Sequence, residues 1–177
     1  MPEPAGRARP PLAILRQMVF NSLGERVIEA RVLDIFAGSG SWGLEALSRG
    51  AASCVFLEQD RRCIQGLKEA LQEFGLSDSA QVIQGRVPQS LARREFSDVG
   101  FGLIFADTPF DAFLRGDFAD LEQRLVSLLA PDGLLLHRVP SQTSSMPPPQ
   151  GLELVKLKAH GISALRFLAP IQQKPAD

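Results

Sequence analysis

The stretch from Arg31 to Gly43, with the sequence RVLDIFAGSGSWG, constrains the fold of this chain more than any other. Its first half is apolar and predicts a short buried strand that extends to Phe36. Glycines then mark a tight turn, and the helix formers that follow predict a helix ending near Gly50. Strand, glycine-rich turn and helix, in this order, are typical of nucleotide sites in open α/β sheets.

The glycine turn fits two classes of ligand. Gly38, Gly40 and Gly43 satisfy the pattern G-x-G-x-x-G, and Glu58 stands at about the right distance for a ribose contact, which favours a dinucleotide oxidoreductase. Asp34, however, stands where dinucleotide-binding strands usually carry an apolar residue. An acidic residue at this point suits a ligand with an ammonium group, such as S-adenosylmethionine (SAM). The methyltransferase interpretation is therefore favoured, with the oxidoreductase and a turn without ligand as alternatives.

Composition limits the architecture. The 177 residues, 45% of them hydrophobic, predict one compact domain and leave little room for the second domain of a typical dehydrogenase. The formal net charge of −1 means that any contact with nucleic acid requires a local basic patch. The cysteines show no metal-ligand spacing, the two histidines make no ligand pair, and neither a secretory leader nor a membrane-length apolar run is evident. We therefore expect a cytoplasmic protein without a metal site or a membrane contact.

The rest of the pattern alternates strands with helices. Residues 1–10 are rich in Pro, Gly and Arg and predict a flexible basic arm, residues 11–170 a single domain, and residues 171–177 a tail. The predicted strands are 32–36, 51–58, 80–84, 100–106, 134–139, 151–158 and 162–168, and the predicted helices are 11–23, 44–49, 61–74, 87–94 and 118–129.

Some details of these elements are specific enough to test. Phe74 is expected on the buried stripe of the third helix, together with Leu67 and Leu71. Pro131-Asp132-Gly133 is a turn signal before a strand, and residues 140–150 read as a polar, proline-rich loop. The final two strands are expected to form an antiparallel hairpin.

Acidic residues stand near the carboxyl ends of three of the predicted strands: Asp34, Glu58 and Asp107. Ligands in open α/β sheets bind beyond the carboxyl ends of the strands, so these side chains should converge. Asp107 begins the tetrapeptide Asp107-Thr108-Pro109-Phe110, whose four residues are the predicted catalytic set. A carboxylate and a backbone carbonyl can accept both hydrogens of an amino group on an aromatic base, which favours a more nucleophilic geometry of its nitrogen. The phenylalanine can stack on the base and hold it near a reactive methyl group.

Most of the chain resembles one known family. The motifs are LDIFAGSGSWGLEALSRGAA (33–52), FLE (56–58) and FADTPF (105–110), together with Arg9-Pro10, Arg16, Phe20 and Asn21. From Arg9 to about Leu168, the sequence is similar to the SAM-dependent methyltransferases that modify the N2 of guanine in small-subunit ribosomal RNA.

The resemblance implies a fold, a cofactor and a substrate. The fold is a single-domain α/β, Rossmann-like methyltransferase domain, with a seven-stranded, mostly parallel sheet of order 3-2-1-4-5-7-6, strand 7 antiparallel, and helices on both faces. The substrate is small-subunit ribosomal RNA or the assembling small subunit, and we expect a monomer. The candidate RNA-binding residues are Arg7, Arg9 and Arg16. The candidate SAM-binding residues are Asp34, Phe36, Gly38, Ser39, Gly40, Glu58, Gln59 and Arg86.

Three positions depart from the family pattern. Thr108 replaces the first proline of an Asp-Pro-Pro-Phe motif, and Gln17 stands where the N-terminal helix usually carries glutamate. Arg86 stands where an aspartate usually meets the adenine amino group, and an arginine cannot accept that hydrogen bond. A degenerate member that binds RNA with weak or no turnover is therefore an alternative to the active enzyme.

Overall fold

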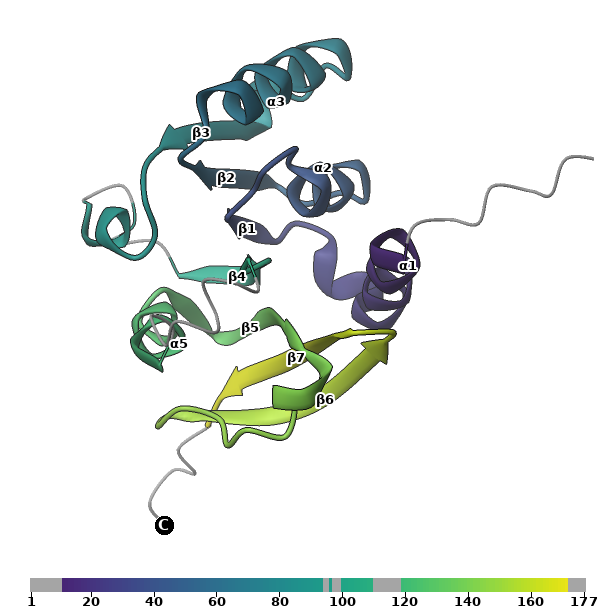
Figure 1. Ribbon diagram of the computed structural model, residues 1–177. Helices are drawn as coiled ribbons and strands as arrows, with labels where there is room; N and C mark the ends of the chain where they lie inside the picture. The colour runs from purple at the N-terminus through teal and green to yellow at the C-terminus, as the bar shows by residue number, and fades with distance from the viewer. Residues whose placement is uncertain (1–10, 94–95, 97–99, 110–118, 172–177) are drawn as a thin grey trace, which may run out of the picture.

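The computed structural model of the chain describes residues 11–93, 96, 100–109 and 119–171. The predicted basic arm (residues 1–10), most of the predicted tail and Phe110 lie outside the described residues. Within the described part, a mixed sheet forms the middle of the molecule and helices lie against both of its faces (Figure 1).

Seven strands form this sheet in the order β3-β2-β1-β4-β5-β7-β6, as the family resemblance predicts. The pairs β1–β2, β2–β3, β1–β4 and β4–β5 are parallel, and β7 is antiparallel to both β5 and β6. Helical crossovers allow the parallel pairs, whereas the tight turn at Gly161 requires an antiparallel hairpin. The bounds are β1 Arg31–Ile35, β2 Ser53–Glu58, β3 Ala80–Gln84, β4 Phe101–Ala106, β5 Leu129–Pro140, β6 Leu152–His160 and β7 Ser163–Pro170.

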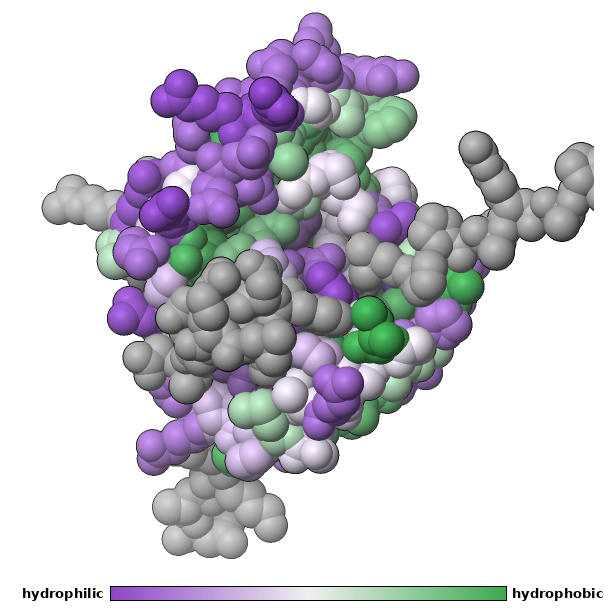
Figure 2. Space-filling model, in the orientation of Figure 1, coloured by the Kyte–Doolittle hydropathy of each residue, from purple (hydrophilic) through white to green (hydrophobic). Residues whose placement is uncertain are grey.

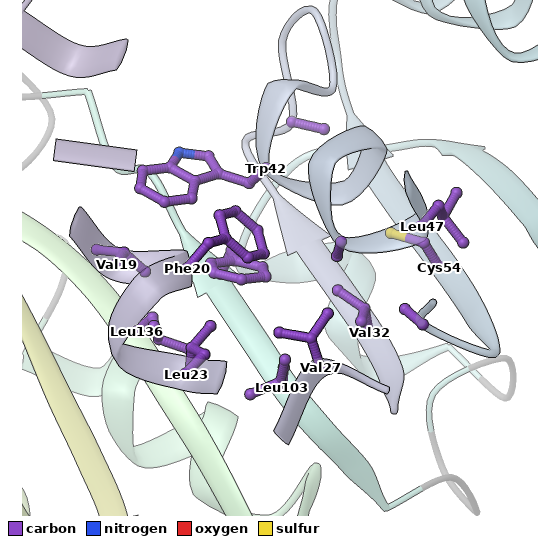
Figure 3. Close-up of a cluster of buried hydrophobic side chains, with 14 of the residues drawn as sticks. Val19, Phe20, Leu23, Val27, Val32, Trp42, Leu47, Cys54, Leu103 and Leu136 are labelled. Atoms are coloured by element: carbon purple, nitrogen blue, oxygen red, sulfur yellow. The ribbon is translucent and has the colours of Figure 1, made fainter. Parts of the chain in front are cut away.

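The helices divide between two buried apolar clusters. α1 (Pro11–Leu23), α2 (Ser41–Ser48) and α3 (Arg61–Glu73) contribute to the first cluster, and α5 (Ala119–Val126) contributes to the second, on the other face of the sheet. In the first cluster Phe20 of α1 and Trp42 of α2 lie side by side, with ring centroids 6.1 Å apart (Figure 3). The 3₁₀ helices are η1 Gly24–Val27, η2 Ser77–Ser79, η3 Gln89–Ala92 and η5 Ser141–Thr143.

Two predictions about single aromatic residues are wrong. Phe36 does not continue β1: its φ of 57° is left-handed, because the chain turns there into the glycine loop. Phe74 is not on the buried stripe of α3: it is the C-cap of the helix and is 62% exposed, whereas Leu67 and Leu71 are buried as expected.

Two predictions about element bounds also need correction. The Pro131–Gly133 segment does not separate two elements but lies inside β5, where the register with β4 shifts. Such a bulge absorbs extra residues without ending the strand. A Cβ on Gly133 would lie 2.6 Å from the carbonyl oxygen of Phe101, so the close approach requires glycine there. The helix predicted over 87–94 is reduced to η3, and part of the predicted loop over 140–150 forms η5.

The surface is polar over the α3 and β3 end of the face seen in Figure 2, in keeping with the many charged residues of α3. Among the residues that the structure describes, each helix is too short or too polar to cross a lipid bilayer.

Candidate active site

The loop between β1 and α2 has the backbone conformation of a ligand-binding turn. Phe36, Gly38 and Gly40 have φ values of 57°, 55° and 75°, and Ser39 between the glycines is exposed. A Cβ on Gly40 would lie 2.4 Å from the Cδ1 of Leu67, so both conformation and space require glycine. A Cβ on Gly38 would meet no atom closer than 3.9 Å, which leaves room above this residue.

Asp34 lies beneath this loop and is fully buried. Its Oδ2 accepts a hydrogen bond from the backbone N–H of Gly43 at 2.9 Å. Its Oδ1 is also buried and has no hydrogen-bond partner within the described part of the chain. Burial, and to a smaller extent the charges of Asp107 and Glu58, raise the pKa of Asp34 well above its usual range. A buried acceptor without a partner fits a ligand that brings a cationic donor, such as an ammonium group.

Glu58, at the end of β2, ties the glycine loop to the start of α3. Its Oε2 accepts from the N–H of Gly38 at 2.7 Å, and its Oε1 accepts from the N–H groups of Gln59 and Asp60, each at 2.8 Å. A carboxylate offers about four acceptor positions, so one remains for a ligand hydroxyl. Glu58 therefore shapes the loop in addition to the ribose contact expected from the sequence.

A shallow hollow of about 440 Å³ lies beside Glu58 and brings together the predicted residues Gln59 and Arg86. Gln84, Gly85 and Asp60 also line it. Asp60 is the N-cap of α3, and its Oδ1 accepts from two backbone N–H groups of that helix. These hydrogen bonds lower the pKa of Asp60. The sequence predicted only this capping role for Asp60, but the side chain of Asp60 also places a carboxylate in the lining of the hollow.

Asp107, at the end of β4, is held from two sides. Its Oδ2 accepts from the Nε1–H of Trp42 at 3.0 Å, and its Oδ1 pairs with the Nε of Arg138 on β5. The indole of Trp42 stacks on Phe105, with ring centroids 5.3 Å apart. Sequence reasoning missed both Trp42 and Arg138. Trp42, the single tryptophan of the chain, could have been noticed because it follows the glycine loop directly.

Thr108 and Pro109 continue from Asp107 in different environments. Thr108 is fully buried, and its Oγ1 lies 3.1 Å from the Nε2 of His137, whereas Pro109 is exposed. The sequence gave His137 no role. Asp34, Glu58 and Asp107 do converge, since both other carboxylates act on the pKa of Asp34.

Of the three predicted RNA-binding residues, the structure describes only Arg16. Arg16, on α1, is half-buried and lines a hollow of about 230 Å³ together with Gln17, Glu45 and Arg49. The guanidinium of Arg49 lies 5.0 Å from the ring centroid of Phe20. Arg7 and Arg9 lie outside the described residues. The described ranges contain no group of three or more His, Cys, Asp or Glu side chains that could hold a metal ion.

Known proteins resemble this chain over most of its length. Residues 2–169 match the family described as Conserved hypothetical protein 95. YlbH of Bacillus subtilis is 36% identical over 121 residues, which cover 68% of this chain and 60% of YlbH. Ribosomal RNA small subunit methyltransferase D of Escherichia coli is 35% identical over 127 residues, which cover 72% of this chain and 59% of that protein. The chain thus spans about 60% of the length of these two curated relatives.

The similarity extends to solved structures. That of yhhF from Escherichia coli superposes with a TM-score of 0.80 at 28% identity, covering 98% of this chain and 92% of that one. A methylase from Haemophilus influenzae superposes with a TM-score of 0.69 at 29% identity, covering 92% of this chain and 100% of the methylase.

Proposed function

This chain belongs to the Conserved hypothetical protein 95 family, and from that premise we propose that it is a SAM-dependent methyltransferase acting on the exocyclic N2 of a guanine in small-subunit ribosomal RNA. The observation that carries the proposal is the hydrogen bond from Trp42 to Asp107. Trp42 belongs to the helix that follows the glycine loop, and Asp107 begins the tetrapeptide that would hold a base. The hydrogen bond therefore brings the proposed cofactor loop and the proposed base-binding tetrapeptide next to each other, which supports the proposal.

The residues around the glycine loop fit SAM. Asp34 offers the ammonium group a buried oxygen that has no partner among the described residues, and Glu58 retains an acceptor position for a ribose hydroxyl. Gln59 and Arg86 line the hollow in which the adenine would lie, with Asp60 as its carboxylate. When bound, SAM supplies a methyl group on a positively charged sulfur, which is the electrophile of the reaction.

The tetrapeptide Asp107–Phe110 would prepare the nucleophile. Asp107 accepts one hydrogen of the guanine amino group and the carbonyl oxygen of Thr108 accepts the other, so the nitrogen lone pair is directed away from the ring. Phe110 stacks on the base. As the methyl group passes to N2, the sulfur of SAM would keep the electron pair of the broken bond and Asp107 would receive the proton that N2 loses. Trp42 and Arg138 fix the direction of this carboxylate.

The RNA must present this base outside a helix, because amino-group contacts and stacking of this kind require an unpaired base. A guanine in a loop or junction is therefore the expected target. The arginines at positions 7, 9 and 16 would bind phosphates around it, either on free RNA or on the assembling small subunit. The protein would act as a monomer in the cytoplasm, where this RNA is assembled.

The proposal is tested by incubating ribosomal RNA or small subunits with labelled SAM and mapping the product. We expect N2-methylguanine with the wild-type protein and no transfer with Asp107→Ala, which should still bind SAM in calorimetric titration. Asp132→Ala, at an exposed aspartate in the bulge of β5, is the matched control and should transfer normally. Label on adenine N6 or on protein would overturn the assignment.

Two other outcomes would support the alternatives. Binding of NAD in place of SAM would identify an oxidoreductase. RNA binding without turnover would identify a degenerate family member, which the exposed Arg86 at the end of β3 specifically favours.

A further inference from the structure

A chain of buried polar side chains lies directly behind the tetrapeptide. The Oγ1 of Thr108 lies 3.1 Å from the Nε2 of His137, and the Nδ1 of His137 pairs with Glu122 of α5. Glu122 also accepts from the Nη1 of Arg166, at 3.2 Å, and the Nη2 of Arg166 donates to the carbonyl oxygen of Met146 at 2.9 Å. The four side chains therefore connect the end of β4 to β5, α5 and β7.

This set lies within the apolar interior. Thr108, His137 and Arg166 are 0%, 1% and 2% exposed, and Glu122 is 8% exposed. Removing such groups from water is costly, and replacement by apolar residues of similar size is often neutral or stabilising. Stability of the fold alone is thus a weak reason for this arrangement. A role in fixing the geometry of the adjacent tetrapeptide is a better one.

Consecutive residues of the tetrapeptide are anchored on opposite faces of the sheet. Asp107 is bonded to Trp42, which belongs to the cluster of α1, α2 and α3. Thr108 is bonded to His137, which lies on the α5 face with Glu122. Because side chains alternate along an extended chain, the two anchors together hold the peptide between Asp107 and Thr108. The carbonyl oxygen of Thr108 is the next acceptor along this chain.

We propose that His137 is a positioning residue: held by Glu122 and Arg166, it fixes Thr108 and so aims the two acceptors that receive the guanine amino group. The hydrogen bond replaces the rigidity that a proline ring supplies in an Asp-Pro-Pro-Phe motif. The catalytic part of this inference rests on the proposed function; the anchoring of Thr108 does not.

Each ring nitrogen of His137 has a side-chain partner. The Nδ1 faces the carboxylate of Glu122 and donates to it, and the Nε2 lies within hydrogen-bond distance of the hydroxyl of Thr108. Glu122 has a permanent cationic partner in Arg166, which keeps the carboxylate directed at the ring. Thr108→Val should remove the bond while preserving the shape of the side chain, and Thr108→Ser should keep the bond.

A double-mutant cycle tests the coupling. Thr108→Val and His137→Phe should each lower the kcat of methyl transfer about tenfold, and the double variant should lose no more than either single variant. Thr108→Ser should recover most of the rate lost in Thr108→Val. The affinity for SAM should stay within about twofold throughout, because these side chains do not line the glycine loop. The proposal would be overturned if the losses of kcat in the two single variants multiplied in the double variant, or if the kcat of Thr108→Val were unchanged.

A second measurement separates this inference from the proposed function. The ¹⁵N resonance of His137 Nε2 should shift between wild type and Thr108→Val, and return in Thr108→Ser, whether or not RNA is methylated. An unchanged resonance would overturn the anchoring. If the resonance shifts in Thr108→Val but the wild-type protein transfers no methyl group, the anchoring is supported and the proposed function is overturned. Thermal unfolding of each variant identifies losses of rate that come only from lost stability.

Discussion

The carboxyl group of Asp34 is buried where its negative charge is unfavourable in the protein without a bound ligand. Burial raises its pKa well above its value of 3.8 in the unfolded chain. Below pH 3.8 the carboxyl group is protonated in both the folded and the unfolded protein. As the pH rises above it, the unfolded chain releases the proton first, so the free energy of unfolding falls until the folded group ionises as well.

This gives a pH dependence that one substitution removes. As the pH rises above about 4, the stability of Asp34→Asn relative to wild type should increase until the folded Asp34 ionises, measured by chemical denaturation without SAM. The same variant should bind SAM more weakly, because an amide has no charge to pair with an ammonium group. A stability difference that is constant across this range would contradict the proposed cost of the buried charge.

Glu58 acts through three backbone N–H groups, those of Gly38, Gln59 and Asp60. Glu58→Ala should weaken SAM binding by roughly 1–3 kcal/mol in calorimetric titration, the scale of a lost hydrogen bond to a charged group. Glu58→Gln is the conservative control and should lose less, because its amide oxygen can still accept. Unchanged affinity in Glu58→Ala would remove this residue from the site.

At the scale of elements, α2 can lie close to β2 only because a glycine faces the sheet. A Cβ on Gly43 would lie 2.3 Å from the Cε1 of Phe56 and 2.6 Å from the Sγ of Cys54. Both of these side chains are buried, so the helix would have to move. Because the N–H of Gly43 also holds Asp34, a displaced helix would disturb the glycine loop as well as the packing.

Two glycines form a matched pair for this argument. Gly43→Ala should destabilise the protein by about 1–3 kcal/mol, the usual cost of overpacking. Gly66→Ala, in the exposed middle of α3 where a Cβ meets no atom within 4 Å, should instead stabilise it by up to about 1 kcal/mol. Urea unfolding of the two variants measures whether the free energy of unfolding falls in Gly43→Ala and rises in Gly66→Ala. Equal effects would show that helix propensity, and not contact with Phe56, decides the result.

For the whole molecule, the charge balance determines how RNA could be bound. With a formal net charge of −1, the chain has no overall attraction for a polyanion, so affinity must come from a local cluster such as Arg7, Arg9 and Arg16. Each neutralised phosphate contributes about −0.7 to −0.9 to the slope of log K against log salt concentration.

Deleting residues 1–9 should therefore make that slope less negative by roughly 1.5, because two arginines are lost, and should leave the affinity for SAM unchanged. Filter binding of small-subunit RNA over a salt series measures the slope. Arg49→Ala, on the same molecule but outside the arm, is the comparison for general loss of positive charge. An unchanged slope after the deletion would show that the arm does not contact phosphates.

The sequence by itself determined the order of elements and the position of the glycine loop. Local physics is sufficient for the elements, because the apolar runs predict the strands. The order of the strands in the sheet comes from the family resemblance, and the structure confirms it. Glycine is required at position 40 both for its left-handed backbone and for the space beside Leu67. The convergence of Asp34, Glu58 and Asp107 also follows, because the carboxyl ends of parallel strands share one edge.

Only the tertiary structure decided which side chains hold the acidic residues. Trp42 and Asp107 are 65 residues apart in the chain, and Thr108 and His137 are 29 apart. Those contacts depend on strand register and on which face of the sheet each helix covers. His137 faces Glu122 because β5 pairs with β4 at Ala106 and α5 covers that face. No periodicity or spacing encodes such a contact, since it exists only once separate elements have packed.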